Sequence, residues 1–160
     1  MELIILIGLQ ASGKSTFYQT RFAATHTLVS KDLLPNATSK DRRQQALIVE
    51  ALAAGRSVVV DNTNPTPAVR APLIALGQQY GATIAGFYLA SNLGACLERN
   101  RQRVGRARVP DVALFSTRKQ LLPPTYAEGF DQIFFVRIGD ASAFTVEPWH
   151  EPHDPAVEPQ

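Results

Sequence analysis

The stretch that decides the fold is Leu3-Ile4-Ile5-Leu6-Ile7-Gly8-Leu9-Gln10-Ala11-Ser12-Gly13-Lys14-Ser15. Its first five residues are an apolar run that is too short to cross a membrane and predicts a buried strand. The remaining eight match the pattern Gly-x-x-x-x-Gly-Lys-Ser in full, and a helix is expected directly afterwards, over 15–24. A strand, a glycine-rich loop and a helix in this order are typical of a P-loop, whose backbone N–H groups bind phosphate.

The P-loop pattern assigns roles to the lysine and the serine at its end. Lys14 is expected to neutralise the β- and γ-phosphates of ATP, and Ser15 to hold Mg²⁺. A glycine-rich turn without a ligand is the alternative, but the strand before it and the helix after it favour a nucleotide site. The predicted nucleotide-binding residues here are Gly8, Leu9, Gln10, Ala11, Ser12, Gly13, Lys14, Ser15 and Thr16.

Further apolar runs rich in β-branched residues follow along the chain, and stretches with helical spacing lie between most of them. The predicted strands are 2–7, 27–30, 57–60, 82–88 and 132–137. This alternation indicates an α/β fold of the P-loop NTPase type, with a parallel sheet of about five strands and helices on both faces. For 160 residues we expect one domain, over 1–143.

Two of the connecting stretches show helical periodicity. In 41–54, Leu47 and Ala51 are spaced at i, i+4. A second helix is expected over 66–79, but a proline inside a helix removes a backbone hydrogen bond. Because Pro72 lies in this stretch, we expect the helix to begin late or to kink.

Charge is unevenly distributed, although the formal net charge is only +2 and does not favour binding nucleic acid through bulk charge. The segment 99–110 is rich in arginine and is expected to be an exposed loop or mobile flap. The stretch 144–160 is acidic and rich in proline, and we expect a frayed tail there.

Cys96, the lone cysteine of the sequence, rules out an intramolecular disulfide. We interpret it as a core residue and expect a cytoplasmic protein without a membrane segment or an obligate protein partner.

Two aspartates follow predicted strands, and loops after parallel strands gather at one rim of the sheet. Asp32 is the candidate general base that takes the proton of an attacking hydroxyl, although an N-cap or surface-turn aspartate is an equally simple interpretation. Asp61 is expected to orient Mg²⁺ or its water. For Asp61 the alternative is that 61–65 is a turn rich in local hydrogen bonds.

The arginine-rich segment has a possible chemical role. Phosphoryl transfer spreads negative charge over the transferred oxygens, and an arginine reaching over the site stabilises that charge. We expect one or two arginines of the segment to do so, although a solvated surface position is the simpler interpretation for any single one. The candidates are Arg99, Arg101, Arg103, Arg106 and Arg108.

Three motifs occur in a fixed order, and they are Val29-Ser30-Lys31-Asp32, Val60-Asp61-Asn62-Thr63-Asn64-Pro65 and Arg99-Asn100-Arg101-Gln102-Arg103. With them the sequence resembles the kinase domain of polynucleotide 5′-hydroxyl kinases, over roughly 3–137. The later stretches resemble that domain as found in DNA-repair kinase–phosphatases, and they are Val109-Pro110-Asp111, Arg118-Lys119-Gln120, Pro124-Thr125 and Ala127-Glu128-Gly129-Phe130. The resemblance implies transfer of the γ-phosphate of ATP to the 5′-hydroxyl end of DNA or RNA.

The resemblance also implies roles for individual residues. Asp32 matches the general base, while Arg99 and Arg103 match lid arginines that clamp the ATP phosphates, with Arg103 also a catalytic candidate. The element 61–64 matches one that lies beside the acceptor end. Its predicted substrate contacts are Asp61, Asn62, Thr63 and Asn64.

The sequence departs from the family in the neighbourhood of the base. Some members carry an arginine there that binds a phosphate of the acceptor, whereas this chain has Pro35 and Asn36. Lys40, Arg42 and Arg43 are the candidates to replace it. The Asp-x-Asp-x-Thr motif of the fused phosphatase is absent from this sequence, so removal of 3′-phosphates is not expected.

The acceptor is the least determined part of the prediction. A kinase for a small molecule, or an antibiotic- or toxin-type phosphotransferase, can use the same scaffold. A non-catalytic nucleotide-binding switch is a second alternative. The Asn-Lys-x-Asp motif that reads guanine is absent, which disfavours a GTPase.

Overall fold

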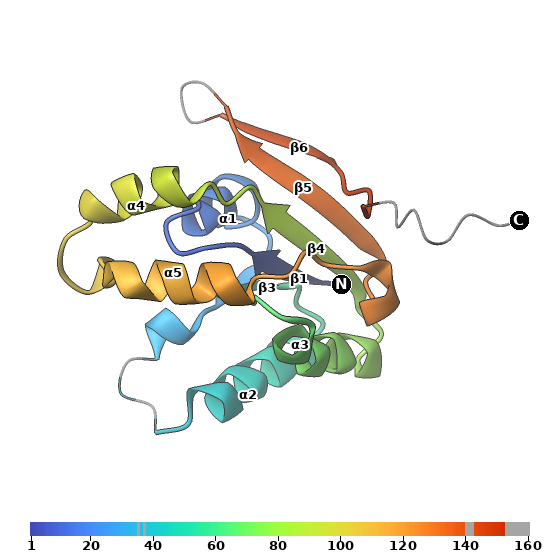
Figure 1. Ribbon diagram of the computed structural model, residues 1–160. Helices are drawn as coiled ribbons and strands as arrows, with labels where there is room; N and C mark the ends of the chain where they lie inside the picture. Colours follow the sequence, from blue (N-terminus) through green and yellow to red (C-terminus); the bar gives the residue numbers. More distant parts are fainter. Residues whose placement is uncertain (35, 37, 140–142, 153–160) are drawn as a thin grey trace, which may run out of the picture.

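The computed structural model describes residues 1–34, 36, 38–139 and 143–152 (Figure 1). Its centre is a six-stranded sheet in the order β2-β3-β1-β4-β5-β6. The first five strands are parallel and occupy the predicted positions, which confirms the α/β prediction, while a sixth strand adds to them in the antiparallel direction. The strands are β1 (Glu2–Ile7), β2 (Thr27–Val29), β3 (Val58–Asp61), β4 (Thr83–Leu89), β5 (Gln132–Ile138) and β6 (Phe144–Pro148).

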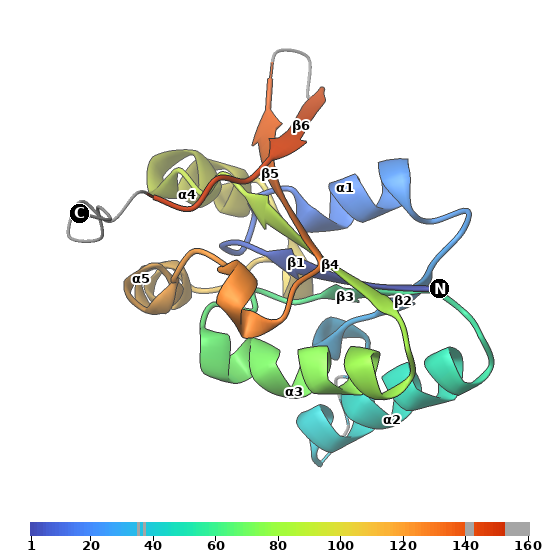
Figure 2. The same cartoon turned by 90° about the vertical axis from the view of Figure 1, so that its right-hand side faces the viewer.

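Helices cover both faces of this sheet, as Figure 2 shows with α1 on one side and α2 and α3 on the other. Strand β1 is buried along Leu3–Ile7 because it lies at the centre of the sheet between these layers. Within the described ranges, no helix combines the length and apolarity needed to cross a membrane. The helices are α1 (Lys14–Arg21), α2 (Lys40–Ala53), α3 (Pro67–Gln79), α4 (Leu93–Arg101) and α5 (Asp111–Gln120), with short 3₁₀ turns η1 (Lys31–Leu33), η2 (Gly105–Ala107) and η3 (Tyr126–Glu128).

The core forms on each side of the sheet from alternate residues of the strands. On one side, Leu3 and Ile5 pack with residues of α2, α3 and α5. Cys96 of α4 belongs to the same cluster and is fully buried, which confirms its interpretation as a core residue. On the other side, Ile4 and Leu6 pack with α1 through Phe17.

The late start expected for the helix over 66–79 is wrong. Helix α3 begins at Pro67, and the Oγ1 of the preceding Thr66 accepts a hydrogen bond from the N–H of Val69 at 3.2 Å. A threonine cap followed by proline at the first helical position is a strong start signal. Pro72 therefore lies inside the helix, where the loss of one backbone hydrogen bond is tolerated.

The frayed tail expected from residue 144 onward is wrong for its first part. Strand β6 pairs with β5, and the backbone N–H of Trp149 donates to the Ile133 carbonyl at 2.9 Å. The Trp149 indole packs against Tyr88 and Phe135 with ring centroids 5.2 and 5.4 Å away. Prolines and acidic residues mask the alternating Phe144, Val146 pattern in the sequence. Positions 153–160 of the expected tail lie outside the described residues.

The arginine-rich segment 99–110 is not a loop throughout. Helix α4 continues through Arg101, and the short turn η2 follows. A second helix that the sequence did not predict, α5, begins at Asp111. A closing movement of the segment stays a prediction.

Candidate active site

A cleft of about 850 Å³ opens where the loops that follow β1, β2 and β3 meet the arginine-rich segment. It is bounded by the P-loop on one side and by η1 and the loop after β3 on the other. The predicted site residues among its walls are Gln10, Ala11, Lys14, Ser15, Asp32, Asp61, Asn62, Thr63, Asn64 and Arg103. Parallel strands deliver these segments to one edge of the sheet, as the sequence predicted.

The P-loop is held in shape by its neighbours. Gly13 has a φ of 97°, in the left-handed region where glycine is favoured, and a Cβ there would lie 2.9 Å from Cδ1 of Ile138. The N–H of Gly8 donates to the carbonyl of Thr63 at 3.1 Å, and the N–H of Leu9 donates to the Ser91 hydroxyl at 3.1 Å. Loops from β3 and β4 therefore fix the start of the phosphate-binding turn.

Lys14 is a buried cation at the base of the cleft. Its Nζ donates to the carbonyls of Gly8 and Leu9 at 3.1 and 2.6 Å. Burial lowers the pKa of Lys14 to about 8, although the carboxylate of Asp61 acts in the opposite direction. A phosphate arriving in the cleft supplies the counter-charge that favours the protonated form.

Ser15 and Asp61 form a pair of oxygen ligands beside Lys14. The Ser15 hydroxyl donates to Oδ2 of Asp61 at 2.7 Å. Burial raises the pKa of Asp61 despite the hydrogen bond from Ser15 and the charge of Lys14. A hydroxyl and a carboxylate at the mouth of a phosphate-binding loop are the hard oxygen donors that suit Mg²⁺, so the residues present fit this ion.

Asp32 lies across the cleft from the P-loop, on the 3₁₀ turn η1. The residue that caps this turn is Ser30, whose Oγ accepts from the N–H of Asp32 at 3.3 Å. Asp32 is therefore not an N-cap, which removes one of the simpler interpretations. The N–H of Lys31 donates to Oδ1 of Asn62 at 3.0 Å, which ties η1 to the loop after β3.

The loop 61–64 uses most of its amide groups to hold itself in place. The Asn62 side chain donates to Oε1 of Gln44 at 2.6 Å. The Asn64 side chain is buried and donates to the carbonyl of Leu6 at 2.8 Å and to that of Asn62 at 3.3 Å. These bonds give Asn62 and Asn64 a structural task at the cleft wall, in line with the interpretation of a hydrogen-bonded turn.

The arginines of 99–110 divide between different surroundings. Arg103 and Arg106 line the cleft. Arg99 lies on the P-loop itself, where its Nε donates to the carbonyl of Ala11 at 2.6 Å. Arg101 points to the surface and lies 3.5 Å from Glu98. Of the two arginines singled out by the resemblance, only Arg103 therefore faces the cleft.

Several supporting contacts were not found from the sequence. Gln10 of the P-loop donates through Nε2 to Thr117 of α5 at 2.9 Å. The buried side chain of Asn100 bonds both backbone groups of Val109, at 2.7 and 3.1 Å, and so fixes one end of the arginine-rich segment. The partner of Gln10 lies 107 positions further along the chain, so this contact exists only in the folded protein. The contact of Asn100 with Val109 stays within the arginine-rich segment, and the place of Asn100 inside an arginine motif hinted at a role.

Comparison with known proteins gives consistent results. The family model described as an AAA domain matches residues 3–124. The bifunctional polynucleotide phosphatase/kinase of Schizosaccharomyces pombe is 31% identical over 136 residues, covering 82% of this chain and 32% of that protein. The putative bifunctional polynucleotide phosphatase/kinase of Acanthamoeba polyphaga mimivirus is 30% identical over 146 residues, with the same coverage of 82% and 32%. The resemblance inferred from the motifs is thereby confirmed, and the chain spans about a third of the length of these relatives.

Solved structures share the fold. A gluconokinase from Sinorhizobium meliloti 1021 matches with a TM-score of 0.63 at 22% identity, over 87% of this chain and 83% of its own. At that identity the likeness concerns the fold alone. The scaffold is that of P-loop kinases.

Proposed function

This chain belongs to the AAA domain family, and we propose that it transfers the γ-phosphate of ATP to the 5′-hydroxyl end of a nucleic acid strand. The observation that carries the proposal is the convergence of Lys14, Ser15, Asp61, Asp32 and Arg103 on one cleft. A phosphate-binding loop, an oxygen pair for Mg²⁺ and a carboxylate across the cleft are the parts that phosphoryl transfer to a hydroxyl requires. The named activity of the relatives supports the choice of acceptor.

The proposed reaction follows from these positions. Asp32 accepts the proton of the 5′-hydroxyl while the hydroxyl oxygen attacks the γ-phosphorus. A P–O bond forms to the acceptor as the bond to the bridging oxygen of the β-phosphate breaks, and ADP leaves with the electron pair. Lys14 and Arg103 stabilise the charge on the transferred oxygens. Ser15 and Asp61 would hold Mg²⁺, and the bound ion would supply positive charge that offsets the negative charge of the phosphates.

Basic side chains on the Asp32 side of the cleft support a polyanionic acceptor. Lys31 and Lys40 line the cleft itself. A second, open groove of about 720 Å³ includes Leu33, Arg42 and Arg43 among its walls and so continues outward from the turn that carries Asp32. The residues proposed to replace the missing arginine of the family thus lie on the Asp32 side of the cleft, and we propose that the phosphates of an acceptor strand extend along them.

The test is transfer of labelled γ-phosphate from ATP to a short 5′-hydroxyl oligonucleotide. We expect Asp32→Ala to lower kcat by about 10²–10⁴ and to leave ATP binding nearly unchanged, because it removes only the general base. Lys14→Ala should lower kcat by about a hundredfold or more. Glu147→Gln is a matched control, since its carboxylate pairs with Arg137 on the β5–β6 hairpin.

Two outcomes would contradict the proposal in different ways. Near-full turnover by Asp32→Ala would remove this residue from the role of base. If the folded wild-type protein binds ATP but labels neither DNA nor RNA, the nucleic acid acceptor is wrong, and transfer to hydroxyls of small molecules should be measured instead. Binding of ATP without transfer to any acceptor would favour a nucleotide-binding switch.

A further inference from the structure

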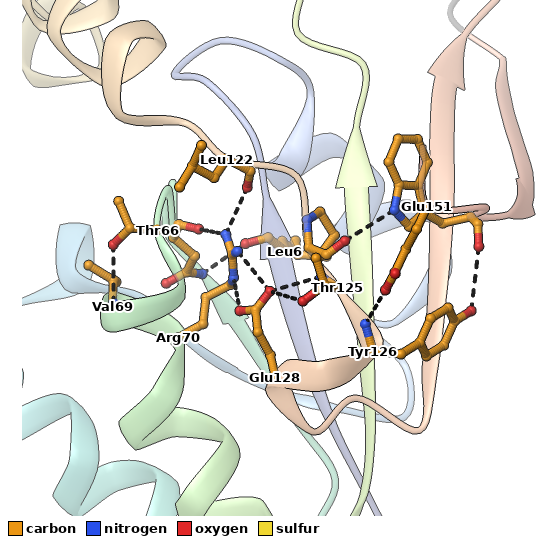
Figure 3. Close-up of polar contacts among 12 residues, drawn as sticks. Leu6, Thr66, Val69, Arg70, Leu122, Thr125, Tyr126, Glu128 and Glu151 are labelled. Carbon is orange, nitrogen blue, oxygen red and sulfur yellow. Dashed lines mark hydrogen bonds and ion pairs between the residues drawn. The ribbon is translucent and has the colours of Figure 1, made fainter. Parts of the chain in front are cut away.

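Arg70 of α3 is fully buried, although arginine is among the residues least often found inside proteins. It lies outside the active-site cleft, behind the loop that follows β3, and Figure 3 shows its guanidinium surrounded by acceptors from three segments. Because none of its side chain reaches solvent, Arg70 has no contact with a substrate. Its role must act through the residues that it holds.

The guanidinium makes four hydrogen bonds. Its Nε and Nη2 donate to the two carboxylate oxygens of Glu128 at 2.7 and 3.0 Å, a bidentate ion pair. Its Nη1 donates to the backbone carbonyls of Asn64 and Leu122 at 3.0 and 3.1 Å. A buried charge is stable only when its hydrogen bonds are satisfied, and here the geometry of the planar fork determines where each partner lies.

Of these contacts, the hydrogen bond to the Asn64 carbonyl connects Arg70 to the cleft, because Asn64 is one of the residues that line it. Asn64 has a φ of 45°, in the left-handed region that costs a residue with a side chain free energy. Its side chain reaches Leu6 at the end of β1, and the neighbouring Thr63 carbonyl accepts from Gly8 of the P-loop. One strained turn is thus pinned to the P-loop on one side and to Arg70 on the other.

Glu128, on η3, is the ionic partner of Arg70, and the two residues together are called the clamp below. Burial acts to raise the pKa of Glu128, but hydrogen bonds from Arg70 and Thr125 outweigh it and lower the pKa, so the pair is ionised at neutral pH. Next to it, the N–H of Leu122 donates to the carbonyl of Pro65 at 2.8 Å. The segment after α5 is therefore bonded to the same loop directly through Leu122 and indirectly through Arg70.

We infer that Arg70 and Glu128 are positioning residues that fix the 62–64 wall of the cleft relative to the P-loop, and so set the distance between the acceptor and the transferred phosphate. The effect on the acceptor and the kinetic readout rest on the proposed function, whereas the positioning of 62–64 does not. Substituting either residue of the pair should displace the 62–64 wall of the cleft. The P-loop should stay nearly unchanged, because it is also held by Ser91 and Thr117.

The first arm of the test needs no substrate. Hydrogen exchange of the backbone amides in 61–66 is compared among wild type, Arg70→Lys, Glu128→Gln and Leu73→Ala. Leu73 is the matched control, because it is buried on the same helix and packs in the hydrophobic core. We expect exchange in 61–66 to accelerate by about tenfold or more in both clamp variants and not in Leu73→Ala, at temperatures where all are folded. Equal protection of 61–66 in all variants would overturn the inference.

The second arm measures kinetics with an oligonucleotide acceptor. Loss of the clamp should raise the KM for the acceptor by about tenfold and change the KM for ATP by less than about twofold. If both KM values rise in parallel, or if Leu73→Ala has the same effect, the inference is wrong and Arg70 contributes only to the stability of the fold. If wild type phosphorylates no nucleic acid, the proposed acceptor fails, while the exchange arm still decides on Arg70.

Discussion

Lys14 shows how one residue can be adapted to a ligand that carries the opposite charge. The pKa of about 8 in the free protein results from burial, which removes water from the ammonium group. The protonated form, which attracts phosphate, is thus complete well below pH 8 and is lost as the pH rises through that value. We therefore expect kcat/KM for ATP to fall above about pH 8, because this ratio reports on the free enzyme.

The control for this pH dependence is internal to the experiment. Bound phosphates raise the pKa of Lys14, so kcat at saturating ATP should persist to higher pH than kcat/KM. The measurement is a pair of pH profiles at constant ionic strength. A kcat/KM profile that stays level to pH 9.5 would contradict the buried-cation account of Lys14.

Among single residues, those that belong to short sequence motifs were predictable, whereas contacts between residues far apart in the sequence were not. Lys14, Ser15 and Asp61 follow from motifs whose chemistry is contained in a few consecutive positions. Arg70 in the sequence is an arginine on an amphipathic helix, and nothing nearby indicates that it is buried. Its meaning depends on Glu128, 58 positions later, and such pairings exist only once the chain has folded.

Among the elements, the arginine-rich segment contains its own matched pair. Arg103 lines the cleft, whereas Arg101 lies on the exposed side of α4 near Glu98. We expect Arg103→Ala to lower kcat by about a hundredfold or more, because it removes the guanidinium that we propose stabilises the negative charge of the phosphoryl group during transfer. Arg101→Ala removes the same charge from the same segment and should change kcat by less than about threefold. Equal losses in the two variants would favour a general electrostatic role for the segment.

Strand β6 and the residue after it close the far edge of the sheet. Trp149 packs against Tyr88 and Phe135, and its Nε1 donates to the Pro124 carbonyl at 3.1 Å. We expect Trp149→Ala to lower the free energy of unfolding by about 2–4 kcal/mol, through lost packing and one lost hydrogen bond. Denaturant titration measures the change, and the exposed His150→Ala is the control. A change below about 0.5 kcal/mol would mean that β6 is a dispensable addition.

The elements differ in how well the sequence predicts them, for a physical reason. Central strands such as β1 are buried on both faces and read as continuous apolar runs. Helix α5 has a single fully buried residue, Leu114, and large exposed side chains such as Phe115, so its periodicity is weak. Strand β6 lies at an edge, where charged residues and proline are common and obscure the alternation.

For the whole molecule, the fold explains why the site assembles without a special device. Five parallel strands present the loops that follow them at one edge, so the P-loop, η1 and the loop after β3 meet there. Because β1 is a central strand, the P-loop that follows it meets the loop after the neighbouring strand β3 at the cleft. The same arrangement serves kinases with different acceptors, such as the gluconokinase with which this chain shares its fold, so acceptor choice has to come from side chains around the rim.

The distribution of charge over the molecule gives a test of that choice. The net charge of +2 is too small to attract a polyanion to the surface as a whole, but Arg42 and Arg43 are exposed beside the turn that carries Asp32. If they contact phosphates of an acceptor strand, each contact releases counterions, and the logarithm of affinity falls with the logarithm of salt concentration by about 0.7 per contact on a single strand. Replacing both by alanine should therefore make the salt slope shallower by about 1–1.5.

The control is a second double variant that removes the same charge elsewhere. Arg101 and Arg137 are exposed, each lies near a surface glutamate, at 3.5 and 3.3 Å, and neither lines the cleft or the groove that includes Arg42 and Arg43. Acceptor affinity of wild type and both double variants is measured at several salt concentrations with a 5′-hydroxyl oligonucleotide. A shallower slope only for Arg42→Ala/Arg43→Ala locates the strand on the Asp32 side of the cleft. Equal slopes in the three proteins would mean that the strand leaves the cleft by another route, because counterion release counts only charges in contact with phosphate.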